Sequence, residues 1–362
     1  MTKQRWSAPG RVNLIGEHLD YQGGPVLPIA IDRRTTVEAA AREDGRVHVR
    51  SERSEQPVEF DVETRPGEVT GWAAYVAGTV WAMRAAGHDV PGLALAVSSD
   101  VPLGAGLSSS AALECAVAVA VRDLAGLDVD DVTLALLAQH AENDYVGMPC
   151  GAMDQLASMC GRAGHALLID TAAAYPAVSP VAADWTADGL VLMVIDTKAE
   201  HELTDGGYAE RRAESGEAAR QLDLDQLAGA TATDLDRLEG VTRRRATHVV
   251  SETARVHACV EAMAARDWSR VGELFTASHG SLRDDYEVSC PELDVAVDTA
   301  IAAGALGARM TGAGFGGSAI ALLPADAVDA VDAAVHQAFE REGLTAPECF
   351  PTSPADGAHA DP

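Results

Sequence analysis

Lysine is almost absent from this chain of 362 residues. Only Lys3 and Lys198 occur, and arginine carries the rest of the positive charge. Neither lysine follows a glycine, so the chain has no Gly-Lys-Ser/Thr phosphate loop of the Walker type. The strand lysine that follows the glycine-rich loop of protein kinases is missing as well. Two widespread ways of holding nucleotide phosphates are therefore excluded.

Other absences narrow the class of protein further. The six cysteines include no Cys-x-x-Cys pair, which indicates reduced thiols rather than a disulfide framework or a zinc site. No run of about 18 uncharged apolar residues is present, and the first ten residues have no apolar stretch. We therefore expect no membrane span, no signal peptide and a cytoplasmic location. Aromatic residues make up only 4%, so the cores must rely on alanine, valine and leucine.

Acidic residues, by contrast, outnumber basic ones by 55 to 27, which gives a formal net charge of −28. A field of that sign repels nucleic acid and anionic membrane surfaces, so we expect neither as a partner. It also repels free nucleotides. Any phosphate site must therefore be built locally, from backbone amides, arginine and metal.

The length suggests about two domains, and the pattern of strands and helices suggests their class. Alternating or apolar strand-like runs lie at residues 35–39, 46–50, 92–98, 166–170 and 190–196, and two more lie within 304–324. Helical spacing covers residues 109–124 and 131–145 and much of 209–275. Because these runs do not alternate regularly, an α+β fold is predicted. We expect domains at residues 1–180 and 181–350, followed by a disordered tail at 351–362.

A glycine-rich segment at residues 102–111 (PLGAGLSSSA) lies between a predicted strand and a predicted helix. Free backbone N–H groups and the positive end of a helix dipole favour phosphate oxygens at such a junction. The three serine hydroxyls can cap the helix, bind phosphate or ligate magnesium. A merely capped helix is the alternative, but two glycines with three consecutive serines favour a phosphate loop.

Two other glycine-rich segments are less specific by themselves. Residues 312–317 (GAGFGG) match the dinucleotide fingerprint, but they lead into a strand-like run rather than a helix, which argues against a Rossmann oxidoreductase. A tight hairpin turn, or a turn that supports the first loop, fits better. Residues 147–155 (GMPCGAMDQ) place Asp154 after a turn, where it can cap a helix or face a substrate hydroxyl.

These segments together resemble the GHMP family of small-molecule kinases and, within it, the galactokinases. The resemblance rests on residues 10–24 (GRVNLIGEHLDYQGG), 102–112, 148–155, 278–293 and 309–318, in the family's order. The Glu-His-x-Asp-Tyr run at 17–21 is the part most specific to galactokinases. The resemblance implies a ribosomal-protein-like N-terminal domain, a ferredoxin-like C-terminal domain and a site between them. It also implies ATP-dependent phosphorylation of a sugar, with galactose favoured.

The resemblance also assigns roles to individual residues. Asp154 matches the catalytic carboxylate, either as a base or as an electrostatic anchor, and Arg11 accompanies it. The residues that match sugar contacts are Glu17, His18, Asp20, Gly151, Asp154 and Tyr208. The residues that match the ATP site are Trp72, Tyr75, Pro102, Gly104, Gly106, Leu107, Ser108, Ser109, Ser110 and Ala111. Ser110 and Glu142 match the ligands of a Mg²⁺ ion bound with ATP.

Two positions depart from the galactokinase pattern. Leu19 stands where threonine is usual, and Gln22 where asparagine is usual. Because Leu19 lies within the sugar signature, a related sugar such as N-acetylgalactosamine or arabinose remains an alternative substrate. A catalytically silent sugar sensor is a further alternative, which the retention of Arg11, Asp154, Ser110 and Glu142 argues against. We expect a monomer that binds a sugar and ATP.

Overall fold

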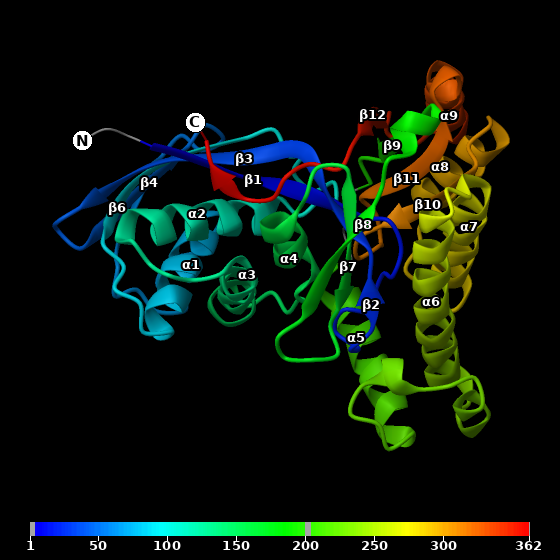
Figure 1. Cartoon of the computed structure of the whole chain (residues 1–362), viewed down its shortest axis with the longest axis horizontal. Coiled ribbons are helices and arrows are strands. Elements are labelled where there is room, and N and C mark those ends of the chain that lie inside the picture. The colour runs from blue at the N-terminus through cyan, green and yellow to red at the C-terminus, as the bar shows by residue number, and fades with distance from the viewer. Residues whose placement is uncertain (1–3, 200–203, 362) are drawn as a thin grey trace.

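A computed structural model of the chain describes residues 4–199 and 204–361. Strands and helices occur in separate runs, which confirms the predicted α+β class. Two sheets, each with its own helices, lie side by side along the longest axis, and a small third sheet lies between them (Figure 1). Across the described residues, no helix combines the length and the apolar character needed to cross a membrane.

The first sheet has six strands in the order β13-β1-β3-β6-β4-β5. Its strands are β1 (Gln4–Asn13), β3 (Pro28–Arg42), β4 (Arg46–Ser51), β5 (Val58–Asp61), β6 (Gly92–Ser99) and β13 (His359–Ala360). The helices beside it are α1 (Ala73–Ala85), α2 (Ser109–Ala125), α3 (Asp131–His140) and α4 (Met153–Cys160), on one face of the sheet in Figure 1. Residues 111–121 of α2 are all buried, which explains why this helix is so rich in alanine and valine.

The second sheet has four antiparallel strands in the order β10-β11-β9-β12. These are β9 (Leu190–Asp196), β10 (Gly307–Thr311), β11 (Ser318–Pro324) and β12 (Glu348–Thr352). Its helices are α5 (Thr204–Gln221), α6 (Gly240–Ala264), α7 (Trp268–Asp284), α8 (Pro291–Ala302) and α9 (Val328–Glu342). The small third sheet pairs β2 (Pro25–Val26), β7 (His165–Asp170) and β8 (Ala177–Ala182).

The predicted disordered tail is wrong. Residues 351 and 352 belong to β12, and β13 returns to the first sheet, where His359 pairs with Ser7 of β1. Arg34 holds this return by donating to the carbonyl oxygens of Asp356 and Gly357 at 2.7 and 2.8 Å. The segment is polar and has no strand periodicity. Backbone pairing, Arg34 and side-chain hydrogen bonds, such as the one from Ser7 to Asp361, therefore hold the segment in place without a hydrophobic face.

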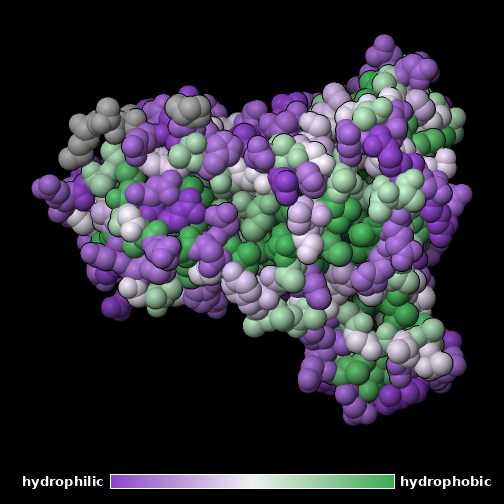
Figure 2. Space-filling view, viewed as in Figure 1, coloured by the Kyte–Doolittle hydropathy of each residue, from purple (hydrophilic) through white to green (hydrophobic). Residues whose placement is uncertain are grey.

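Hydrophilic residues cover most of the face shown in Figure 2, in keeping with the large excess of acidic side chains. Hydrophobic residues on this face gather towards the middle of the molecule, where the two halves meet. The functional side chains also lie between the two halves.

Candidate active site

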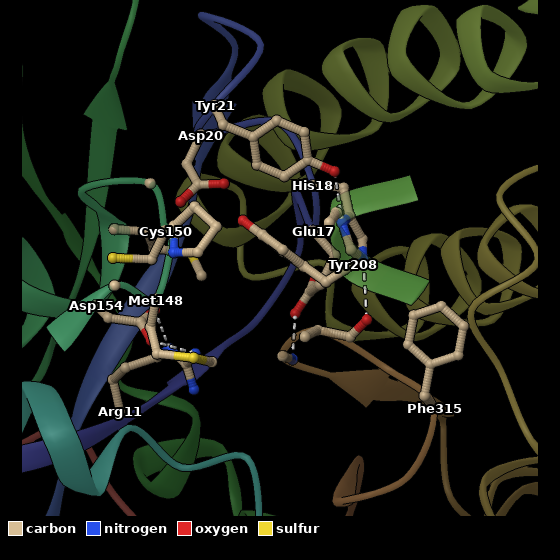
Figure 3. A pocket seen from close by; sticks show the side chains of 17 residues that line it. Arg11, Glu17, His18, Asp20, Tyr21, Met148, Cys150, Asp154, Tyr208 and Phe315 are labelled. Carbon is tan, nitrogen blue, oxygen red and sulfur yellow. Dashed lines mark hydrogen bonds and ion pairs between the residues drawn. The ribbon is translucent and has the colours of Figure 1, made fainter. Parts of the chain in front are cut away.

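A cavity of about 450 Å³ lies between the two halves of the molecule, and segments far apart in sequence converge on it (Figure 3). It is lined by β1 and the loop that follows it, by the turn before α4, by α5 and by the turn after β10. The lining residues are Arg11, Glu17, His18, Asp20, Tyr21, Gly147, Met148, Pro149, Cys150, Gly151, Met153, Asp154, Tyr208, Ala209, Gly312, Ala313 and Phe315. The structure thus brings together every residue that the sequence assigned to sugar binding or catalysis.

Asp154 lies in the first turn of α4 and is held from two sides. Arg11, on β1, donates Nε to Oδ1 and Nη2 to Oδ2, each at 2.8 Å. Ser108 donates its hydroxyl to Oδ2 at 2.5 Å. A bidentate arginine fixes the plane of a carboxylate as well as its position. Asp154 is therefore presented to the cavity in one orientation, where it can accept a hydrogen bond from a bound hydroxyl.

The glycine-rich loop passes directly behind this pair. Arg11 donates Nη1 to the carbonyl oxygen of Gly106 at 2.6 Å. Both Gly104 and Gly106 have left-handed backbone angles, with φ of 74° and 70°, which favour glycine. Ser108 is left-handed too, and its side chain binds Asp154 instead of capping α2. The loop and the pair of Arg11 with Asp154 therefore form one unit.

The turn at residues 312–317 supports that loop and opens no helix. Ser318 donates its hydroxyl to the carbonyl oxygen of Ala105 at 2.7 Å. A Cβ atom at Gly312 would lie 3.1 Å from the carbonyl oxygen of Gly106, and one at Gly317 would lie 3.2 Å from that of Ala105. The glycines therefore allow two backbone turns to pack closely, as expected for a supporting turn.

Beside Asp154 lies a buried cluster of carboxylates. Gln155 donates Nε2 to Oε2 of Glu142 at 2.6 Å and to Oε2 of Glu114 at 3.2 Å. The hydroxyl of Ser110 also bonds to Glu142. Glu142 lies on a π-helical turn, Ala141–Val146, that continues α3, although the sequence predicted one regular helix there. Such turns are frequent at functional sites.

This cluster fits a divalent cation. Burial, and then the charge of Asp154, raise the pKa of Glu142 to about 7, and burial and Glu142 raise the pKa of Glu114 well above its usual range. Oε1 of Glu114 and Oε1 of Gln155 are buried without a hydrogen-bond partner among the described residues. A hydroxyl and a carboxylate, with phosphate and water, are the oxygen ligands that Mg²⁺ prefers. Ser110 and Glu142, the two predicted ligands, lie next to each other.

Comparisons with known proteins agree with this geometry. The family model of the GHMP kinase N-terminal domain matches residues 74–162, that of the C-terminal domain matches 259–341, and the galactokinase galactose-binding signature matches 2–41. The galactokinase of Streptomyces coelicolor is 47% identical over 361 residues, covering 98% of this chain and 93% of that protein. The galactokinase of Mycobacterium tuberculosis is 45% identical and covers 98% of both chains.

The chain therefore belongs to the GHMP kinase family and, within it, to the galactokinases. A crystal structure of Lactococcus lactis galactokinase complexed with galactose superposes with a TM-score of 0.92, at 36% identity over 99% of this chain and 95% of that one. A mevalonate kinase with a TM-score of 0.69 and 18% identity shares the fold alone. The predicted fold and family are confirmed, and the chain is an ATP-dependent sugar kinase by family.

In this galactokinase-family site, Asp20 and Gly151 are packed against each other. Asp20 accepts backbone hydrogen bonds from Met153 and Tyr21, and burial, followed by the charge of Asp154, raises its pKa to about 6. A Cβ atom at Gly151 would lie 1.8 Å from Oδ2 of Asp20. Glycine is therefore required at position 151 for the carboxylate to lie where it does.

His18 and Tyr208, which are predicted to contact the sugar, form an aromatic wall of the cavity together with Tyr21. Nδ1 of His18 lies 2.8 Å from the hydroxyl of Tyr21, and Nε2 lies 3.0 Å from the carbonyl oxygen of Ala313. Burial lowers the pKa of His18 to about 3, so this side chain is neutral at pH 7. The ring of Tyr208 lies 5.8 Å from that of His18. Sequence reasoning did not assign Tyr21 a role, although it ends the Glu-His-x-Asp-Tyr run.

Glu17 links the two halves of the molecule. Its Oε2 pairs with the fully buried Arg309, and its Oε1 accepts from the backbone N–H of Gly312 at 3.1 Å. Arg309 also donates to the carbonyl oxygens of Asn13 and Leu14 at 3.1 and 2.9 Å. Glu17 lines the cavity, and its contact with a sugar hydroxyl stays a prediction, while its carboxylate holds the sugar signature to the turn after β10.

We expect Arg309→Gln to lower the free energy of unfolding by about 3–5 kcal/mol, because Glu17 would stay buried without its cation. Urea unfolding followed by circular dichroism measures this loss. The control is Arg341→Gln, since Arg341 is exposed on α9 and pairs with Glu342 at 3.5 Å. Equal stabilities for the two variants would contradict the assignment.

Trp72 and Tyr75 lie at the start of α1 and are half-buried against the core. Burial, and then Glu142, raise the pKa of Tyr75 to about 12, which shows that Tyr75 lies near the carboxylate cluster. Neither residue lines the sugar cavity. Their role at the adenine stays a prediction.

Leu19 and Gln22, the two departures from the family pattern, also lie outside the cavity lining. Leu19 is fully buried and packs beside Gly24. Gln22 is buried, and its carbonyl oxygen accepts from the backbone N–H of Ala228 at 3.2 Å. Leu19 is therefore a core residue, and it gives no structural reason to expect another sugar.

Proposed function

We propose that this chain transfers the γ-phosphoryl group of ATP to the anomeric hydroxyl of galactose and so forms galactose 1-phosphate. The observation that carries the proposal is the carboxylate of Asp154, which Arg11 and Ser108 hold between the cavity and the glycine-rich loop. The match to the galactose-binding signature, and the relative solved with galactose, support the choice of sugar.

The cavity supplies the groups that would bind the sugar. The Asp20 carboxylate offers an acceptor for a sugar hydroxyl, and the side chains of His18 and Glu17 lie beside it in the cavity wall. Gly151 lets the Asp20 carboxylate lie close to the turn before α4, and the ring of Tyr208 forms the rest of the cavity wall. Asp154 then orients the anomeric hydroxyl, which is the main task of a kinase site because phosphoryl transfer depends on positioning and electrostatics.

ATP would lie on the other side of Asp154, with its phosphates along residues 102–111. Backbone N–H groups and the start of α2 favour phosphate oxygens there. Ser110 and Glu142 would hold Mg²⁺, which neutralises phosphate charge when bound. Arg11 is a protein cation next to the loop, because it donates to the carbonyl oxygen of Gly106. Trp72 and Tyr75 would stand near the adenine.

The domain division and the state of the protein belong to the same proposal. Residues 1–180 and 181–350 would be the two family domains, although β13 returns to the first sheet. The enzyme would be a monomer, and use of ATP supports a cytoplasmic enzyme. Size-exclusion chromatography with light scattering tests whether the protein is a monomer.

A coupled assay for ADP release tests the activity itself. We expect galactose-dependent release with Mg-ATP, far above that with glucose, N-acetylgalactosamine, arabinose or no sugar. Higher activity on another sugar of the panel would show that the chain is a sugar kinase whose preferred substrate is that sugar and not galactose. Folded protein that binds ATP but releases no ADP with any sugar would overturn the proposal in favour of a sensor.

Glu142→Gln is expected to raise the Mg²⁺ concentration for half-maximal activity at least about tenfold, because a neutral amide is a poor ligand for a hard cation. Titrating Mg²⁺ at fixed ATP measures the change, and Mg²⁺-dependent nucleotide affinity gives a second readout. Glu261→Gln, on the exposed side of α6, serves as the control. An unchanged Mg²⁺ dependence would show that Glu142 is not a ligand.

Galactose affinity should weaken below pH 6. The pKa of Asp20 is raised to about 6, so acid protonates this carboxylate and removes an acceptor for a sugar hydroxyl. Well below that pH, affinity should fall about tenfold per unit, as expected for a single required carboxylate. Calorimetric titration of galactose from pH 5 to 8 measures this. Asp20→Asn should bind weakly with a flat profile, and a wild-type slope in that variant would assign the effect to another group.

A further inference from the structure

A cluster of potential metal ligands lies in the second half of the molecule, outside the sugar cavity. Asp332 and His336 are four residues apart on α9, so their side chains share one face of that helix. Cys349 comes from β12, which follows α9 in the chain. One carboxylate oxygen, one imidazole nitrogen and the thiol sulfur all lie within 4.8 Å of one another.

The position of the cluster separates it from the proposed catalytic groups. Figure 1 shows α9 and β12 at the top of the second half, whereas α5, which carries Tyr208, lies at the bottom. None of the three residues lines the sugar cavity. The proposed Mg²⁺ ligands, Ser110 and Glu142, belong to the first half.

The charges around the cluster favour a cation. In the described part of the chain, Asp332 pairs with His336, whose Nδ1 lies 3.3 Å from Oδ1, and with no lysine or arginine. Lys198, which follows β9, is already paired with Asp196 at 2.5 Å and with Glu348 at 2.8 Å. The thiol of Cys349 is hydrogen-bonded to the side chain of Asp332. A divalent ion would neutralise the charge of the Asp332 carboxylate, with which no lysine or arginine of the described residues pairs.

The donor set indicates which ion fits. Thiolate, imidazole and carboxylate together suit Zn²⁺, whereas Mg²⁺ prefers oxygen ligands alone. Donor atoms around a tetrahedral Zn²⁺ lie about 3–4 Å apart, as bonds of about 2.0–2.3 Å require. Because Asp332 and His336 are each a little over two-fifths exposed, their side chains can rotate to close the distance without moving the core.

We propose that Asp332, His336 and Cys349 form a binding site for a zinc-class divalent ion that joins α9 to β12. The three side chains would supply three ligands, and water would supply the fourth. On binding, the Cys349 thiol releases its proton to solvent and the thiolate bonds to the metal, with no change of oxidation state. Since β12 pairs with β9, the ion would hold the edge of the four-stranded sheet to its last helix.

Cobalt is the most direct probe, since Co²⁺ bound to a thiolate gives a charge-transfer absorption band in the near ultraviolet. The whole chain, first stripped with a chelator, is titrated with CoCl₂, and ZnCl₂ should then displace the band. We expect Cys349→Ser to abolish the band and His336→Gln to weaken Co²⁺ binding at least about tenfold. ZnCl₂ should also raise Tm in the unmodified chain and leave it unchanged in Cys349→Ser.

Two further cysteine variants act as controls. Cys290→Ser removes a half-buried thiol at the start of α8, and it should keep the band. Cys150→Ser removes the thiol that lies 3.7 Å from Glu142, another place where sulfur and carboxylate meet. If the chain shows no thiolate band, or if Cys150→Ser abolishes the band while Cys349→Ser keeps it, the proposal is overturned.

Discussion

Asp154→Asn is expected to lose at least about a thousandfold in kcat, within the range of about 10²–10⁴ typical for removal of a group that handles a reacting proton. The amide keeps the shape of the side chain but loses the charge that Arg11 pairs with through two hydrogen bonds. It also turns an N–H₂ group towards either Arg11 or Ser108, which both donate. The reacting hydroxyl would therefore lose its acceptor and its orientation together.

Steady-state ADP release at saturating galactose and Mg-ATP measures this loss. Asp144→Asn is the matched control, because Asp144 lies on the π-helical turn that precedes the same loop, is exposed, and pairs with His140 at 2.7 Å. Circular dichroism and Tm should show that both variants fold. A folded Asp154→Asn enzyme with nearly normal kcat would exclude Asp154 from the reaction.

The parts of the fold that the sequence predicted are those with a strong local signal. The alternation at 46–50 and the alanine-rich and valine-rich run after Ser109 became β4 and α2, because burial on one face or all round leaves a pattern in neighbouring residues. The return of β13 to β1 left no such pattern. Its pairing joins the two ends of the chain through backbone groups, and every sequence has these.

The candidate site likewise contains residues that the sequence predicted and residues that it did not. The family resemblance led to Arg11 and Asp154, and the cavity brings them together. It did not lead to Glu114, although a glutamate within an otherwise apolar helix was a signal, since a buried carboxylate needs a partner. The pairing of Glu17 with Arg309 spans 292 positions and has no local signature. Electrostatic partners such as these are set by the tertiary fold.

Gly151→Ala should weaken galactose binding at least about a hundredfold, a loss expected when a polar group built to bind a substrate hydroxyl is displaced. The new methyl carbon would lie 1.8 Å from Oδ2 and 2.3 Å from Cγ of Asp20. Asp20 cannot easily retreat, because backbone N–H groups of Met153 and Tyr21 hold its carboxylate. Either the carboxylate rotates out of place or the turn before α4 moves, and both changes damage the sugar site.

Calorimetric titration of galactose measures the effect, and kcat/KM should fall with it. Gly280→Ala is the control, since Gly280 lies within α7, where an added Cβ atom would meet nothing within 4 Å. That variant should gain up to about 1 kcal/mol of stability, because alanine favours a helix interior more than glycine does.

The double variant Asp20→Ala/Gly151→Ala separates the clash from the lost contact. We expect the clash in Gly151→Ala to lower Tm as well. The double variant should recover this Tm, because the obstructing atoms are gone, while galactose binding stays weak. A single Gly151→Ala variant with unchanged affinity would mean that Asp20 has room to move and that its position does not select the sugar.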